Sequence, residues 1–160
     1  MTWFDVVALL LLALVAWLES LRGFGRALFD IIGAIIALKV ASVLSGPLSS
    51  SMPLFGAGAS SEAFWYATSF VVLCALVVIG SKVIYETTLL SLDVFDPVVG
   101  GLLGAASGMV VGHVFLTTLL TIYGDAEAAN ILTSSFVGQE LIRFRTYHHV
   151  IAWLQNLGNW

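Results

Sequence analysis

One stretch of the chain, from Asp96 to Gly112, restricts the possible folds most. Asp96 suits the N-cap and Pro97 the first turn of a helix, so the sequence predicts a helix start here. Glycines then recur at every fourth position, at Gly100, Gly104, Gly108 and Gly112. In water each would cost a helix about 1 kcal/mol relative to alanine, whereas in a bilayer such a row lets a second helix approach closely. We therefore expect the row to form a helix-packing face shielded by protein and not by lipid.

The composition supports a membrane environment for this helix. Of the 160 residues 59% are hydrophobic and only 10% are charged, whereas soluble domains have about 25% charged residues. The formal charge of −4 argues against a nucleic-acid surface. Cys74 is the single cysteine, which excludes a disulfide or a thiolate metal site within the chain. The sequence therefore predicts an all-α integral membrane protein.

Four apolar runs are long enough to be transmembrane helices: residues 2–18, 27–44, 63–81 and 98–123. We expect residues 1–123 to form a four-helix transmembrane bundle. Between the second and third runs, residues 45–61 are rich in Gly, Ser and Pro, which predicts an aqueous loop, with Ser61 capping the third helix.

Residues 124–160 differ in character from the bundle. Between Gln139 and Leu154, apolar residues recur at helical spacing, at Leu141, Phe144, Tyr147, Ile151 and Leu154. This segment is too polar to span a bilayer, so we expect a C-terminal amphipathic helix that lies on the membrane or folds back onto the bundle.

The basic residues indicate the orientation only weakly. With the amino terminus outside, Arg22, Arg26 and Lys82 lie in cytoplasmic loops, while Arg143 and Arg145 lie outside. These loop charges favour outside termini by three to two, and counting Lys39, near the outer end of its run, makes the balance even.

A few ionisable residues interrupt the apolar runs. Asp30, Lys39 and His113 are the candidate embedded polar residues, and Asp5 lies near the first run's start. If they converged they would line a polar pathway, as in a transporter or channel; near span ends such residues more often anchor the helix. His113 is either a proton-relay candidate or a hydrogen-bonded packing residue. Asp30 follows Arg26 by four residues and could pair with it.

No residue pattern indicates catalysis. Ser107 and His113 are six positions apart on one helix, about 120° around it and about 9 Å along it, so they cannot pair as nucleophile and base. His148 and His149 are adjacent and point in different directions, which is a poor metal chelate. We expect no enzyme activity, no cofactor and no metal.

Several short motifs occur in a recognisable order. They are Trp3-Phe4-Asp5, Arg22-Gly23-Phe24 followed by Arg26, Asp96 followed by the glycine row, and residues 131–138. Together they make the chain resemble the bacterial colicin V production protein family over nearly its whole length. The sequence departs from that family at Pro97 and Ser107, where arginines are frequent.

The resemblance implies an inner-membrane protein of about four spans that is required for colicin V production and export and is linked to cell-envelope homeostasis. Some relatives carry a serine-protease domain outside the cytoplasm after a similar bundle, which implies periplasmic termini. Arg22, Gly23, Arg26 and Asp96 would then form a cytoplasmic cluster. The expected partners are membrane lipids, envelope or secretion proteins and a second copy of the chain, without nucleic acid. The alternative is a small transporter or channel that uses the embedded polar residues.

Overall fold

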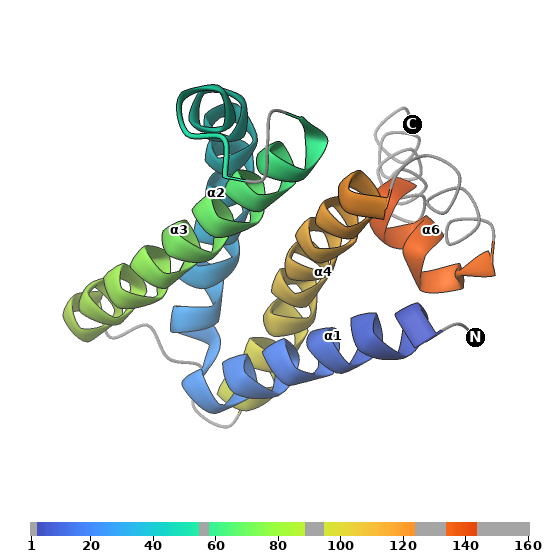
Figure 1. Ribbon diagram of the computed structural model, residues 1–160. Coiled ribbons are helices and arrows are strands. Elements are labelled where there is room, and N and C mark those ends of the chain that lie inside the picture. The colour runs from blue at the N-terminus through green and yellow to red at the C-terminus, as the bar shows by residue number, and fades with distance from the viewer. Residues whose placement is uncertain (1–2, 55–57, 89–94, 124–133, 144–160) are drawn as a thin grey trace, which may run out of the picture.

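Five helices make up the described part of the chain in the computed structural model (Figure 1), which covers residues 3–54, 58–88, 95–123 and 134–143. They are α1 (Trp3–Arg22), α2 (Phe24–Ser51), α3 (Ala59–Thr88), α4 (Asp96–Tyr123) and α6 (Phe136–Arg143). No strand occurs within these ranges. The prediction of an all-α fold is confirmed.

The four long helices are each long and apolar enough to cross a membrane. The apolar stretch of α1 has 19 residues, which is about 28 Å of helix and just matches a hydrocarbon core of ~30 Å. The stretches of the other three have 27 or 28 residues, or about 40 Å, so those helices tilt or extend beyond the core. The prediction of four helices that are long and apolar enough to span a membrane is therefore confirmed.

The connection between α2 and α3 is shorter than the sequence suggests. The predicted loop over residues 45–61 is wrong at both ends, because α2 continues through Pro47 to Ser51 and α3 begins at Ala59. Serine hydroxyls on both sides of Pro47 donate to backbone carbonyls of the preceding turn, Ser45 to Ser42 and Ser50 to Pro47.

The start of α3 also differs from the predicted cap. Ser61 lies inside the first turn, where its backbone N–H donates to the Gly58 carbonyl at 3.1 Å. At its other end α3 continues to Thr88, so the more polar residues from Lys82 onward prolong this helix.

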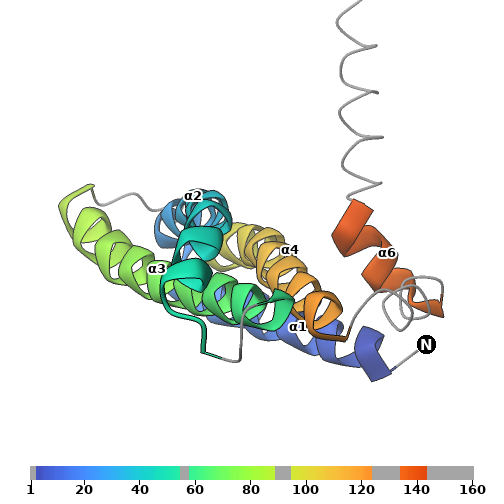
Figure 2. The ribbon, with the colours of Figure 1, turned by 45° about the horizontal axis from the view of Figure 1, so that its top comes forward.

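The helices pack as two pairs joined through α4. Helix α1 packs along α4, and α2 packs along α3, while α4 also contacts α2 and α3 (Figure 1 and Figure 2). Helix α6 lies against α4 and the amino-terminal end of α1. Consequently α4 is the central helix, and the glycine row lies on it.

Small residues line the face of α2 that is buried in the bundle. Ala34, Ala37 and Ala41 pack against Phe70 of α3 and against Val110 and Val114 of α4. A second cluster joins α1, α4 and α6 through Phe4, Ala8, Leu116 and Leu141.

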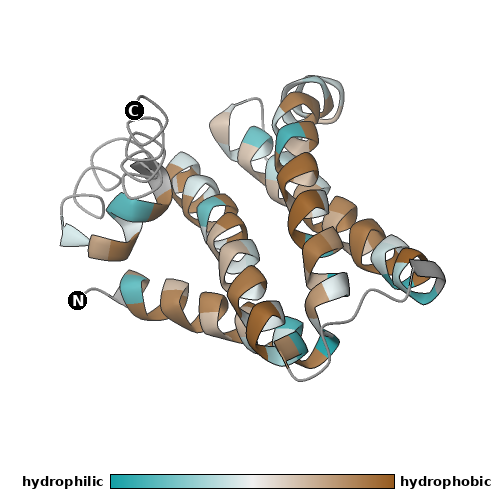
Figure 3. Cartoon of the chain, turned by 180° about the vertical axis from the view of Figure 1, so that it is seen from behind, coloured by the Kyte–Doolittle hydropathy of each residue, from teal (hydrophilic) through white to brown (hydrophobic). Residues whose placement is uncertain are grey.

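The outward faces of the long helices are apolar, as Figure 3 shows along most of their length. On α3, for example, Val71, Leu76 and Ile79 are each at least 60% exposed. Aqueous exposure of so many large apolar side chains is unfavourable, whereas acyl chains solvate them. Close packing through small residues inside and an apolar surface outside is the pattern of a membrane bundle.

Candidate functional site

Polar side chains gather at the turn between α1 and α2. Five residues there, which we call the corner cluster, come from three helices and the connection between two of them: Glu19, Arg22, Gly23, Asp30 and Asp96.

Gly23 and Asp96 shape the backbone at the start of α2. Gly23 precedes α2 with a φ of 85°, a left-handed conformation that favours glycine. Asp96, in the first turn of α4, accepts a hydrogen bond from the Phe24 N–H at 3.2 Å and so caps α2. A Cβ on Gly23 would lie 2.5 Å from the Asp96 Oδ2 atom, so a larger residue would displace the carboxylate that holds the Phe24 N–H. The sequence pattern relates Asp96 to its own helix and gives no sign of this contact.

Arg22 forms the ionic part of the corner cluster. Its Nη1 atom lies 2.8 Å from Glu19 Oε1 and 3.3 Å from Asp30 Oδ2, and both acidic side chains are buried. A buried carboxylate is unfavourable by several kcal/mol unless a cation offsets its desolvation, so one guanidinium links α1 to α2. The second oxygen of each carboxylate, Glu19 Oε2 and Asp30 Oδ1, is buried without a hydrogen-bond partner among the described residues.

The predicted pairing of Asp30 with Arg26 is wrong, because the ion pair of Asp30 goes to Arg22. The left-handed turn at Gly23 brings Arg22 beside the second turn of α2, a proximity that helical spacing cannot indicate. Arg26 is half-buried, and its Nε atom has no hydrogen-bond partner within the described ranges. Sequence reasoning missed Glu19, although its position three residues before Arg22 on one helix is a usable signal.

The glycine row of α4 faces two different neighbours. At Gly100, Gly104 and Gly108, a Cβ would lie 2.9 Å from a backbone atom of α1. A Cβ on Gly112 would instead lie 3.0 Å from the Leu141 Cδ1 atom of α6. Protein therefore covers all four positions, and three of them let the α1 and α4 backbones come into contact.

Helix α6 is attached to α1 through a buried carboxylate. Asp5 is only 1% exposed, and its Oδ1 atom accepts hydrogen bonds from the Ser135 hydroxyl and, at 3.1 Å, from the Val137 N–H. Ser135 in turn accepts the Gly138 N–H at 2.8 Å and so caps α6. A serine before an apolar run is a recognisable cap signal, but nothing local links it to a residue 130 positions earlier.

His113 attaches α6 to α4. Its Nδ1 atom lies 2.8 Å from the Leu141 carbonyl oxygen. Because a carbonyl oxygen only accepts, Nδ1 carries a hydrogen and donates it. In the described structure, His113 is thus a hydrogen-bonded contact between two helices.

The three candidate embedded residues lie apart from one another. Asp30 belongs to the corner cluster, and His113 contacts α6 near the middle of α4. Lys39 is exposed on α2. The structure does not bring them together into one polar pathway.

Residues with potential chemical reactivity are also separate. Ser107 is buried in α4, and its hydroxyl has no hydrogen-bond partner among the described residues. Cys74 is a free, half-buried thiol on α3. The described ranges contain no group of three or more His, Cys, Asp or Glu side chains that could hold a metal ion. His148 and His149 lie outside the described residues.

Comparison with known proteins identifies one family. The family model described as Colicin V production protein matches residues 4–145, a range that begins at the second residue of α1 and includes the other three long helices and α6. No curated protein sequence and no solved structure gives a significant match.

Proposed function

Because this chain belongs to the Colicin V production protein family, we propose that it supports the production and export of colicin V or a similar toxin from the bacterial inner membrane. In this proposal the protein also contributes to cell-envelope homeostasis. It acts through contacts with proteins and lipids and not through catalysis. The observation that carries the proposal is the family match across all four membrane-spanning helices.

The use of the polar side chains supports an action through contacts. Asp5 and His113 hold α6, Arg22 holds Asp30, and Asp96 caps α2. These groups are engaged in holding the helices together. The surfaces left for partners are the apolar outer faces and the helix ends.

The proposed topology puts both termini in the periplasm and the corner cluster at the cytoplasmic face. Arg22, Arg26 and Lys82 then lie on the cytoplasmic side and Arg143 and Arg145 on the periplasmic side, so the loop charges favour this topology by three to two, and by none when Lys39 is counted. Membrane lipids, secretion or envelope proteins and a second copy of the chain are the proposed partners. Reporter fusions after Ser50, Glu86 and the last residue test this topology, and a cytoplasmic carboxyl terminus would contradict it.

Complementation tests the role in toxin production. A colicin V-producing strain that lacks the gene receives the wild-type protein, Gly108→Leu or the control Gly80→Leu, and secreted toxin is measured together with membrane levels of the protein. Gly108 faces the α1 backbone, whereas a Cβ on Gly80 would meet nothing within 4 Å. We expect secretion from the wild type and Gly80→Leu and little from Gly108→Leu. Equal secretion with and without the gene would refute the proposal.

A further inference from the structure

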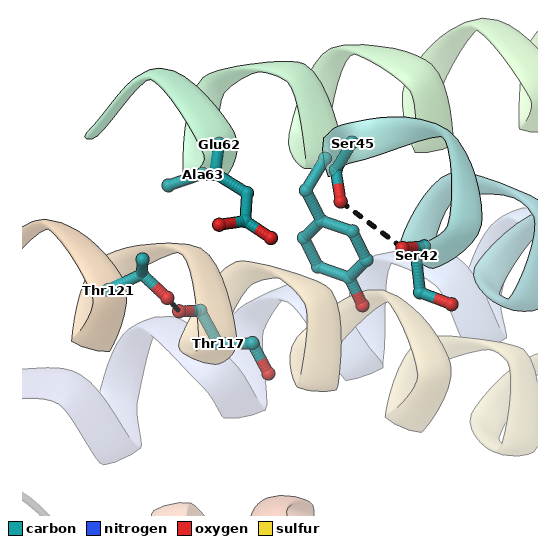
Figure 4. A pocket seen from close by; sticks show the side chains of 7 residues that line it. Ser42, Ser45, Glu62, Ala63, Thr117 and Thr121 are labelled. Atoms are coloured by element: carbon teal, nitrogen blue, oxygen red, sulfur yellow. Dashed lines mark hydrogen bonds between the residues drawn. The ribbon is translucent and has the colours of Figure 1, made fainter. Parts of the chain in front are cut away.

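A cavity of about 340 Å³ with several polar side chains in its lining opens between α2, α3 and α4, towards the end of α2 and the start of α3 (Figure 4). Its polar lining comes from all three helices: Ser42, Ser45, Glu62, Tyr66, Thr117 and Thr121. None of these residues belongs to the corner cluster or to the contacts that hold α6. The volume falls within the range of small-molecule sites.

Three hydroxyls in this lining have already used their hydrogen. Ser42 donates to the Lys39 carbonyl at 2.8 Å, Ser45 to the Ser42 carbonyl at 3.2 Å, and Thr121 to the Thr117 carbonyl at 2.8 Å. A hydroxyl that donates to its own helix offers only lone pairs to a ligand. These three hydroxyls therefore present hydrogen-bond acceptors from α2 and α4, and the Tyr66 and Thr117 hydroxyls can accept as well as donate.

Glu62 adds a negative charge to these acceptors. It lies in the first turn of α3, and Figure 4 shows its carboxylate directed into the space between α3 and α4, towards Thr117 and Thr121. Glu62 is exposed, and neither ion pair of the described ranges involves it. A carboxylate together with hydroxyl lone pairs is suited to a ligand that is positively charged and donates several hydrogen bonds.

The cavity lies near the start of α3 and the end of α4. Glu62 is four residues into α3, and Thr121 is two residues before the end of α4. Trp65, one turn after Glu62, donates its indole N–H to the Met52 carbonyl at 2.9 Å, and indoles prefer the membrane interface. A lipid headgroup can therefore reach this cavity from the bilayer.

We propose that the cavity binds the primary ammonium group of a phosphatidylethanolamine headgroup. Glu62 neutralises the ammonium charge, and the lone pairs of Ser42, Ser45 and Thr121 accept its hydrogens. The trimethylammonium group of phosphatidylcholine carries the same charge but donates no N–H hydrogen bond. Phosphatidylglycerol has hydroxyl donors but no positive charge. The site thus distinguishes three headgroups by charge and by hydrogen bonding.

Native mass spectrometry of the full-length protein in detergent tests this inference. The three phospholipids, with identical acyl chains, are added singly, and the bound fraction is titrated. We expect phosphatidylethanolamine to bind at least about tenfold more tightly than either other lipid, as charge-assisted hydrogen bonds imply. Glu62→Gln should remove this preference, and Glu62→Asp should retain part of it. Glu86→Gln, which changes an exposed glutamate towards the other end of α3, should leave the preference unchanged.

Equal binding of phosphatidylethanolamine and phosphatidylcholine would overturn the proposal, as would an unchanged preference in Glu62→Gln. A similar loss in Glu62→Gln and Glu86→Gln would also overturn it, because the effect would then not depend on the cavity. Lipid binding is measured on purified protein, so its failure is distinguishable from a failure of the toxin-secretion assay.

Discussion

Replacement of Gly108 by alanine tests the close contact of α1 with α4 directly. The added Cβ would lie 2.9 Å from the Leu12 Cα atom and 3.2 Å from its carbonyl oxygen. Carbon atoms pack best at about 3.5–4.0 Å, so the two helices must separate by roughly 0.6–1.1 Å at this point. The neighbour is helix backbone, which cannot rotate away as a side chain can. We therefore expect a loss of about 1–3 kcal/mol in the free energy of unfolding.

Two other glycines provide matched controls for Gly108→Ala. At Gly112 the new Cβ would meet the Leu141 Cδ1 atom at 3.0 Å, the end of a flexible side chain that can move. At Gly80 it would meet nothing within 4 Å, so alanine should be neutral or should stabilise α3 by up to about 1 kcal/mol. The structure thus predicts a graded order, with the largest loss at Gly108, a smaller one at Gly112 and none at Gly80.

Unfolding in mixed micelles of increasing SDS content measures this order. Far-ultraviolet circular dichroism follows the helices, and reversibility is checked by dilution back into the mild detergent. If Gly108→Ala proves as stable as Gly80→Ala, the α1 and α4 backbones are not in contact, and the reasoning from the glycine row fails.

Three further predictions concern the polar contacts. Asp96→Ala should lower the free energy of unfolding by about 1 kcal/mol, because it removes the cap of α2. Gly23→Ala should lower it by more, because alanine there has an unfavourable φ and also clashes with the Asp96 carboxylate. Thermal unfolding of both variants compares the two losses. Arg22→Gln should cost about 3 kcal/mol, since it leaves buried carboxylates without a cation, and adding Glu19→Gln should restore part of that loss in a double-mutant cycle. Asp5→Asn should speed amide hydrogen exchange in α6 while the exchange of α3 stays unchanged, and equal exchange of α6 in both proteins would contradict the anchoring role of this carboxylate.

The sequence by itself determined the features that depend on local spacing. The length and apolarity of four runs predicted four membrane-spanning helices, because a bilayer requires about 20 apolar residues per span. The pair Asp96-Pro97 marked the start of α4, which the structure places at Asp96. The glycines at every fourth position defined one side of α4, since residues four positions apart lie on the same face of a helix.

Only the tertiary structure decided which segments meet. The glycine spacing could not tell that Gly108 faces α1 while Gly112 faces α6. In the same way, Asp30 pairs with an arginine of the preceding helix and not with the arginine one turn earlier in its own. Asp5 meets Ser135 from the far end of the chain. Each of these contacts depends on the rotation of a helix about its own axis and on its position in the bundle. The packing of whole helix surfaces determines both, and no local sequence pattern does.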